Sequence, residues 1–303
     1  MTSVPPQHGS VGPTPDMLET RLGPVEYARV GSGIPVVVLH GSPGGIDAAA
    51  LMAAFLPRDE ICAILLSRPG YLGTELGTRQ TPDQQADLVA ALLDALDIPA
   101  AGVLAWSGGG PCGFRLAVRH PARVTAIVAF ATVSRGYRPP RTGLSDRLML
   151  GTAPGRWLLR LLAERRPEDV VTGTLRSESS LTGELLRDRV AEVMADPVKR
   201  EFVLGLAGTA GLGPDRRAGY RNDLAQFAVI RSLDLERIAA PTLVVHGTAD
   251  TDVTPDHGEY AAATIPGARR LDLDDGSHLA LYTHPDAADA QRQVVDVLLG
   301  RGT

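Results

Sequence analysis

Ser107 is the residue whose surroundings most clearly suggest chemistry. It stands between an apolar run at 103–105, which has the pattern of a buried strand, and a helical pattern that starts at Gly110, with Gly108 and Gly109 in between. A serine in a sharp strand-to-helix turn is typical of a nucleophile elbow, where a strained backbone exposes the hydroxyl and small neighbours relieve crowding. A glycine-rich turn with an incidental serine has the same letters, so partner residues must decide between the two interpretations.

A serine hydroxyl needs a base within hydrogen-bond reach and a carboxylate that orients the base. His278 follows a predicted strand at 269–273 through a short polar turn, so it lies where active sites of open α/β sheets form. Asp250 follows another predicted strand, and Asp252 is the alternative acid two residues later. We therefore predict Ser107 as nucleophile and His278 as base, with Asp250 or Asp252 as the orienting acid.

Acyl transfer also needs two N–H donors aimed at the oxyanion of the tetrahedral intermediate. The backbone of Gly108, directly after the nucleophile, is expected to supply one donor. The backbone of Ser42, in a loop rich in glycine after the predicted strand at 36–39, is expected to supply the other. Trp106 is next to the nucleophile and is predicted to line the substrate pocket.

The composition narrows the classes of function. The net charge of −5 does not predict nucleic-acid binding, and the single lysine, Lys199, lies in a polar helical stretch that does not favour Schiff-base or phosphate-loop chemistry. Cys62 and Cys112 lack metal-binding spacing, so we expect neither a metal nor an organic cofactor. With no signal peptide and no apolar run near the roughly 20 residues of a membrane span, we predict a cytoplasmic protein with a small-molecule substrate. The oligomeric state stays open, with a homodimer as one option.

The order of patterns along the chain predicts the organisation. Apolar strands without polar alternation, each followed by a helix, indicate an α/β fold with a mostly parallel central sheet and helices on both faces. We expect a flexible tail at 1–17, the α/β core at 18–134 and 233–303, and a helical cap, or lid, at 135–232. The cap carries 17 basic and 12 acidic residues against 13 and 23 in the remainder, which predicts electrostatic attraction to the core. Its expected helices are 146–162, 183–195, 198–207 and 222–231.

Five segments in order resemble the α/β-hydrolase fold superfamily: residues 31–45, 67–74, 105–109, 245–250 and 276–278. The resemblance covers roughly residues 20–300 and implies a serine-nucleophile member with a helical cap. It also implies the chain order nucleophile, acid, histidine, which Ser107, Asp250 and His278 follow. The family pattern, with the acid ahead of a Thr-Pro that opens the next helix, favours Asp250 over Asp252. Position 105 is alanine where the family usually has glycine, and we expect its small side chain to be tolerated.

This resemblance implies a serine hydrolase that cleaves a small-molecule ester or related acyl bond through an acyl-enzyme. A serine in place of aspartate at the elbow argues against the relatives that open epoxides or remove halide. Carbon–carbon bond hydrolysis and lactone hydrolysis stay open, as does a proline-iminopeptidase-like aminopeptidase, because residues 40–44 match the loop of that group. A further alternative is a member that binds a ligand without turnover, since fold alone does not fix function.

Overall fold

The computed structural model describes residues 13–139 and 149–301. Its centre is a sheet of eight strands: β1 (Asp16–Thr20), β2 (Gly23–Val30), β3 (Ile34–Leu39), β4 (Ile61–Leu66), β5 (Ala101–Trp106), β6 (Val124–Phe130), β7 (Thr242–Gly247) and β8 (Arg269–Leu273). Their order across the sheet is β1-β2-β4-β3-β5-β6-β7-β8. Strands β4, β5 and β7 are buried along their whole length, which explains why their sequences show no polar alternation.

From β4 to β8 every neighbouring pair of strands is parallel, so the predicted mostly parallel sheet is confirmed. The sequence patterns did not predict β1 and β2, which form an antiparallel edge. Strand β1 begins at Asp16 and pairs with β2, so the end of the predicted tail at residue 17 is corrected by two residues. The rest of that tail, residues 1–12, lies outside the described residues.

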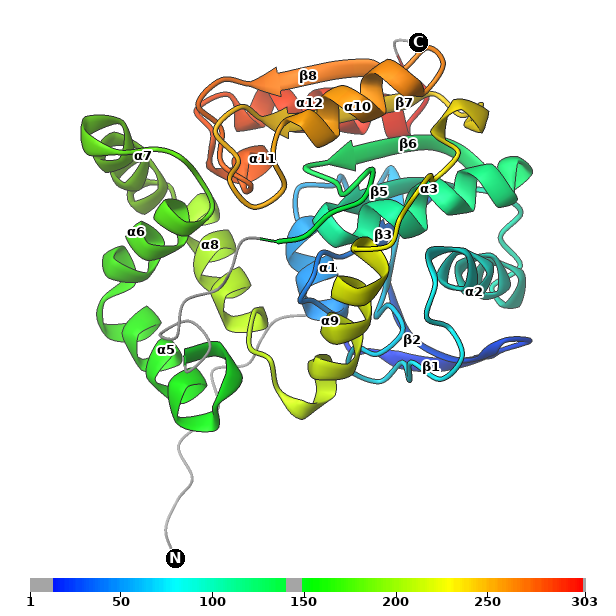
Figure 1. The fold of residues 1–303 in the computed structure, drawn as a ribbon, viewed down its shortest axis with the longest axis horizontal. Helices are drawn as coiled ribbons and strands as arrows, with labels where there is room; N and C mark the ends of the chain where they lie inside the picture. Colours follow the sequence, from blue (N-terminus) through cyan, green and yellow to red (C-terminus); the bar gives the residue numbers. More distant parts are fainter. Residues whose placement is uncertain (1–12, 140–148, 302–303) are drawn as a thin grey trace, which may run out of the picture.

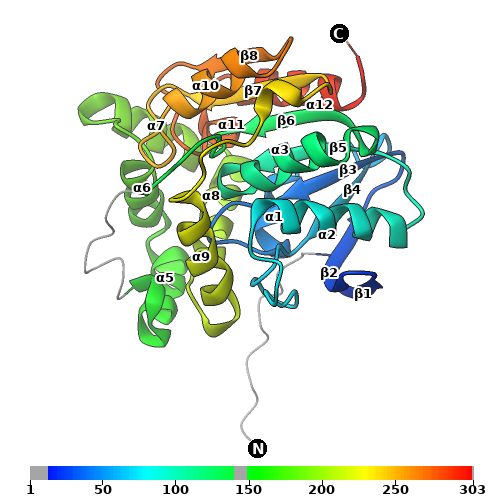
Figure 2. The same cartoon turned by 45° about the vertical axis from the view of Figure 1, so that its right-hand side comes forward.

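Helices cover both faces of the sheet (Figures 1 and 2). One face is packed by α1 (Ile46–Met52), α11 (Ala280–Thr283) and α12 (Ala287–Leu298), and the other by α2 (Pro82–Ala95), α3 (Gly110–Arg119) and α10 (Asp256–Thr264). Short 3-10 helices are η1 (Ser107–Gly109), η2 (Pro121–Arg123) and η3 (Leu235–Arg237). None of the helices in the described ranges combines the length with the apolar character that a membrane crossing requires.

A helical insertion separates β6 from β7, and the C-terminal ends of the parallel strands face it (Figure 1). Its described helices are α5 (Ala153–Arg165), α6 (Pro167–Ser177), α7 (Gly183–Ala195), α8 (Pro197–Thr209) and α9 (Pro214–Phe227). The sequence patterns missed α6, placed the start of α9 eight residues too late at 222, and started the first helix at 146, where residues 140–148 lie outside the described part. Figures 1 and 2 show α9 between α5 and the core helices, which brings it close to the loops that follow β3 and β4.

The insertion and the core share one apolar cluster. Side chains of α6, α7 and α8, among them Val171, Val193 and Phe202, belong to the same cluster as those of α1 and α12. Phe202 stacks face to face on Tyr282 of α11, with ring centroids 3.7 Å apart, and the Tyr282 hydroxyl donates to the carbonyl of Leu51 at 2.7 Å. The insertion is therefore held to the core by buried apolar contact, in addition to the ion pair of Arg216 with Asp47.

Phe202→Ala should lower the free energy of unfolding by about 3–5 kcal/mol, because it removes a ring that is 4% exposed and leaves a cavity beneath α8. Urea unfolding followed by circular dichroism measures this change. Val198→Ala on the same helix is the matched control, since Val198 is 65% exposed and its loss should change stability by under about 0.5 kcal/mol. A loss below about 1 kcal/mol for Phe202→Ala would contradict the role given to this contact.

Candidate active site

Ser107 lies in the turn from β5 to α3 in left-handed backbone geometry, with φ of +51°. Non-glycine residues rarely adopt this conformation, and they concentrate at functional sites. The side chain is buried, and the Ser107 carbonyl accepts a hydrogen bond from the amide of Val133 at 3.0 Å. The local geometry is that of a strained strand-to-helix turn and not of a flexible linker.

The glycines after Ser107 are required by close neighbours. A methyl group on Gly109 would overlap the carbonyl oxygen of Leu39, and one on Gly110 would lie 2.6 Å from the Cβ of Thr132. Alanine at 105 fits because the helix opposite it carries Gly113, whose own Cβ would lie only 3.2 Å from that of Ala105. The methyl group of Ala105 is thus accommodated between the sheet and α3.

Asp250 and His278 come together at the carboxyl ends of β7 and β8. The Nδ1 of His278 donates to the Oδ2 of Asp250 at 2.7 Å, with both side chains buried. The other oxygen of Asp250 accepts the backbone N–H groups of Asp252 at 2.9 Å and Val253 at 3.1 Å. Burial alone would raise the pKa of Asp250, but His278 and His246 overcome it and lower the pKa, so this carboxylate is ionised.

His246 was not predicted as part of the site, yet its side chain lies against that of Asp250, the predicted acid. Its Nε2 lies 2.8 Å from the carbonyl of Val253, to which it donates, and 3.3 Å from the Oδ2 of Asp250. The ring is completely buried at the end of β7. A histidine within the strand that precedes the acid is the only sequence signal that could have indicated this support.

The Nε2 of His278 faces Asp252, whose Oδ2 lies 3.6 Å away. Among the described side chains, no hydrogen bond joins Ser107 to His278, although the ring of the adjacent Trp106 lies beside the imidazole with centroids 5.8 Å apart. Burial would lower the pKa of His278, but Asp250 and, more weakly, Asp252 and Glu178 raise it overall. The two candidate acids therefore contact different nitrogens, with Asp250 in the orienting position and Asp252 near the nitrogen that a base must use.

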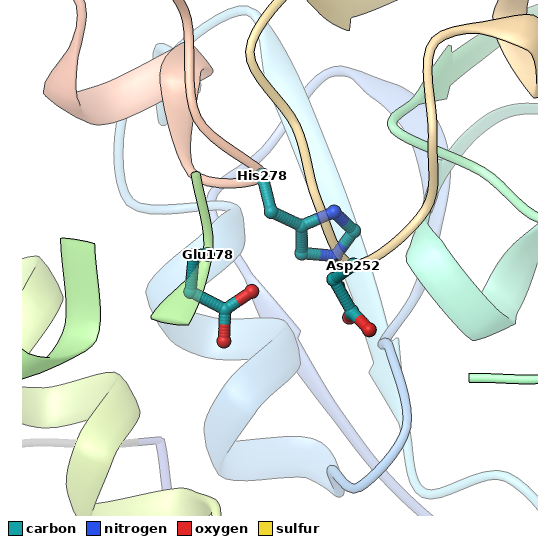
Figure 3. Close-up of side chains that lie close together, drawn as sticks. All are labelled: Glu178, Asp252 and His278. Atoms are coloured by element: carbon teal, nitrogen blue, oxygen red, sulfur yellow. Dashed lines mark ion pairs between the residues drawn. The ribbon is translucent and has the colours of Figure 1, made fainter. Parts of the chain in front are cut away.

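Glu178, just after α6, is a second unpredicted member of the site. Figure 3 shows its carboxyl group and that of Asp252 around the His278 ring. The Glu178 carbonyl accepts the His278 amide at 2.9 Å, and its buried Oε2 has no hydrogen-bond partner. Burial and the nearby Asp252 raise the pKa of Glu178, which favours a neutral carboxyl group.

Glu178, Asp252 and His278 offer one ligand atom each within 4.8 Å of one another, so among the described residues they are a set that could hold a metal ion. Nitrogen and carboxylate oxygen are ligands that zinc accepts. The set shares His278 with the Asp250 pair, so a metal bound through Nε2 would remove the nitrogen that a general base needs. Metal binding and base catalysis would exclude each other at this site.

The loop after β3 lies directly against the Ser107 turn. A Cβ on Gly41 would be 3.1 Å from that of Ser107, and a methyl group on Gly108 would overlap the Ser42 hydroxyl. The two residues predicted to supply oxyanion donors, Ser42 and Gly108, are thus in contact. His40 orders the loop, because its Nδ1 donates to the Gly41 carbonyl at 2.7 Å and its Nε2 accepts the Arg68 amide at 3.0 Å.

The histidines at 257 and 284 and the thiol of Cys112 are engaged in local packing and hydrogen bonds outside the candidate site. His257 accepts the amide of Ser134, and burial lowers its pKa to about 4. His284 bonds the carbonyl of Asp274 and the amide of Asp286 in the turn before α12. Burial raises the pKa of Cys112 to about 12, so its thiol stays protonated at neutral pH.

The chain belongs to the α/β-hydrolase fold family. The model of the alpha/beta hydrolase fold matches residues 34–285, a range that contains Ser107, Asp250 and His278. An alpha/beta hydrolase fold protein from Nakamurella multipartita is 49% identical and has a TM-score of 0.92, over 95% of this chain and 100% of that chain.

Two curated proteins also match over most of their length. One is an uncharacterized hydrolase, YcgS, from Bacillus subtilis, 24% identical over 272 residues that cover 88% of this chain and 92% of that protein. Another is a 2-hydroxy-6-oxononadienedioate/2-hydroxy-6-oxononatrienedioate hydrolase from Cupriavidus pinatubonensis, 26% identical over 272 residues that cover 87% of this chain and 86% of that protein.

Asp252→Asn should lower the pKa of His278, because it removes a carboxylate that stabilises the imidazolium at Nε2. Titration of the ring nitrogens by ¹⁵N NMR measures this pKa, with the signals assigned by their loss in His278→Gln. Asp256→Asn is the control, because Asp256 is an exposed carboxylate paired with Arg135. An unchanged pKa in Asp252→Asn, or an equal shift in the control, would contradict the arrangement.

Proposed function

We propose that the protein is a serine hydrolase that cleaves a small-molecule ester or related acyl bond through an acyl-enzyme. The observation that carries this proposal is the buried 2.7 Å hydrogen bond from His278 to Asp250 at the same sheet edge as the left-handed Ser107. In the proposed reaction, the Ser107 hydroxyl attacks the carbonyl carbon and its proton passes to the Nε2 of His278. That proton then goes to the leaving alcohol as the bond to the acyl carbon breaks. A water molecule, deprotonated by His278, finally releases the acid and restores Ser107.

The negative charge that forms on the carbonyl oxygen needs fixed donors. The backbone N–H groups of Ser42 and Gly108 are proposed to supply them, and the contact between these two residues beside Ser107 supports this role. Asp250 keeps the proton of His278 on Nδ1 and so leaves Nε2 free to act. Because Nε2 faces Asp252 in this structure, we infer that substrate binding turns it toward Ser107.

The helical insertion is proposed to act as the cap of the site. Residues 135–232 would then be a separate unit on a core made of 18–134 and 233–303, as the sequence predicts. Glu178 comes from this insertion and faces His278, which supports a cap that contributes side chains to the pocket. Trp106 is proposed to line the pocket from the core side, next to the imidazole.

An aminopeptidase related to the proline iminopeptidases is a second candidate function, and one observation favours it. Glu178 and Asp252 place two carboxyl groups next to His278, and Tyr137 donates to the carbonyl of Asp252 at 2.8 Å. The carboxylate of Asp252 next to the imidazole would attract a protonated amino group, which an ester substrate need not carry. The alternative of a protein that binds a ligand without turnover would be excluded by measured hydrolysis of a substrate.

A fluorophosphonate should label the wild-type protein on Ser107, and Ser107→Ala should not be labelled. Mass spectrometry of the labelled peptide identifies the site. His278→Ala should slow labelling by about 10³-fold or more, since the base is lost while the oxyanion donors stay. Asp250→Asn should be slowed by a similar factor because the imidazole takes the wrong tautomer, whereas Asp252→Asn should stay within about tenfold of wild type. Equal labelling of Ser107→Ala would contradict the proposed nucleophile. Slower labelling of Asp252→Asn than of Asp250→Asn would show that Asp252, and not Asp250, is the orienting acid.

A panel of activated substrates separates the candidate reactions. Hydrolysis of p-nitrophenyl esters of short acyl chains should exceed hydrolysis of aminoacyl-p-nitroanilides at equal concentration, measured by release of the chromophore. Exclusive cleavage of the anilides would favour the aminopeptidase. Failure on both, with hydrolysis of the 2-hydroxy-6-oxo compound after which the Cupriavidus relative is named, would instead favour carbon–carbon bond hydrolysis.

A further inference from the structure

A buried carboxylate from the helical insertion lies behind the Ser42 loop. Asp223 of α9 is 1% exposed and accepts hydrogen bonds from three core residues. The Arg68 guanidinium donates to both oxygens, at 3.1 and 2.7 Å, in a bidentate pair. The hydroxyl groups of Tyr71 and Ser42 donate to the Oδ2 at 2.6 and 2.5 Å.

The side chain of Ser42 is fully engaged in this network. Its hydroxyl donates to Asp223 and accepts from the Nη2 of Arg68 at 2.9 Å, so its orientation is fixed from two sides. On the opposite side the same hydroxyl touches Gly108, where no further atom would fit. The residue that carries the proposed oxyanion amide is therefore held between the nucleophile turn and a carboxylate of the insertion.

Arg68 extends the same restraint to the rest of the loop. Its Nη2 donates to the carbonyl of Gly41 at 3.2 Å, and its Nε donates to the carbonyl of His40 at 3.0 Å. Arg68 is itself 1% exposed, so its charge needs a buried counter-charge, which Asp223 supplies. Burial and Asp223 raise the pKa of Tyr71, so its phenol keeps the proton that it donates.

Helix α9 reaches the core through backbone contact as well. The amide of Gly219 donates to the carbonyl of Gly70 at 2.9 Å, and a Cβ on Gly70 would lie 2.5 Å from the Gly219 backbone. The amide of Leu72 donates to the carbonyl of Asp215 at 2.7 Å. A helix that packs backbone to backbone on this loop cannot move away without uncovering the Arg68–Asp223 pair.

We propose that Asp223 is a positioning residue that fixes the Ser42 amide in the oxyanion hole, so that α9 is a permanent part of the catalytic apparatus. The inference rests on the proposed serine hydrolase function. It assigns to the insertion a structural task in transition-state stabilisation, in addition to covering the site. It also predicts that the loss of Asp223 lowers kcat more than it raises KM, because the oxyanion forms only during the reaction.

The experiment compares Asp223→Asn, Ser42→Ala and the double variant with the wild type on one p-nitrophenyl ester. We expect kcat to fall by about 100-fold in each single variant while KM changes by under about threefold. The inhibition constant of a trifluoromethyl ketone, which forms a tetrahedral adduct with an oxyanion, should rise by the same factor as kcat falls. The double variant should be no slower than the slower single variant, because both substitutions release the same residue.

Asp47→Asn is the matched control. Asp47 pairs with Arg216 of α9, with distances of 3.0 and 2.5 Å, so its loss weakens the docking of the same helix without touching Ser42. We expect its kcat to stay within about twofold of wild type. Ser42→Ala keeps the Arg68–Asp223 pair, so it tests the inference even if Asp223→Asn does not fold, which thermal unfolding would reveal.

Three results would overturn the inference: a wild-type kcat in folded Asp223→Asn or in Ser42→Ala, an equal loss in Asp47→Asn, or multiplying losses in the double variant. Fluorophosphonate labelling keeps these results distinct from failure of the proposed function. A wild type that is neither labelled nor active would overturn both proposals. A labelled, active wild type whose Asp223→Asn and Ser42→Ala variants react at its rate would overturn the positioning role alone.

Discussion

The turn after β5 has no room for side chains on the residues that follow Ser107, and the placement of the surrounding loops depends on this steric constraint. Gly109 lies against the β3 carbonyls, Gly110 against Thr132 after β6, and Gly108 against Ser42. Because β3 and β6 flank β5 in the sheet, their loops reach the turn from opposite sides. A larger residue at any of these positions would push a loop away from Ser107. The contact of Ser42 with Gly108 is thus a consequence of strand order and of glycine.

Two groups of ionisable side chains lie near this turn: the completely buried Arg68–Asp223 pair, and a cluster around His278 in which Asp252 is partly exposed. Arg68 and Asp223 form a bidentate pair whose charges cancel, and most of their other hydrogen bonds go to the Ser42 loop, with one more from Arg68 to Gln85 of α2. Around His278, in contrast, the three carboxyl groups of Asp250, Asp252 and Glu178 lie near only two imidazoles, those of His278 and His246, and the raised pKa of Glu178 favours its neutral form. A balanced buried pair resists change because breaking it leaves an isolated charge, whereas an unbalanced cluster responds to protons and to ligands. The Arg68–Asp223 pair is therefore suited to holding a loop in place, and the cluster around His278 is suited to changing its protonation during a reaction.

The strand-end rule explains why Ser107, Asp250 and His278 could be selected from the sequence. The loops that follow parallel strands lie at one edge of the sheet, so the proximity of residues far apart in the chain can be predicted from the sequence. Asp223 could not be found in this way, because α9 buries Gly219, Asn222, Asp223 and Phe227 and shows no apolar stripe. The charge counts predict basic residues of the insertion paired with acidic residues of the core, as in Arg216–Asp47. In the buried Arg68–Asp223 pair, however, the core supplies the base and the insertion supplies the acid. Glu178 likewise depends on how the insertion folds back over the core, which local patterns do not encode.

The carboxyl groups around His278 place opposite demands on a general base. In the proposed reaction they would stabilise the imidazolium that forms once Ser107 has lost its proton, and so they would favour the tetrahedral intermediate. The same groups favour the imidazolium in the free protein, and a ring that is already protonated cannot accept the proton of Ser107. A bound ligand that weakens the interaction of Asp252 or Glu178 with His278 would resolve this conflict, because it would lower the pKa of His278 only when substrate is present. A cationic group on the substrate would do so by pairing with these carboxylates, and a neutral acyl group would do so by separating Nε2 from Asp252. The preference of the protein among substrates and the pH dependence of its reaction should therefore depend on the same two carboxyl groups.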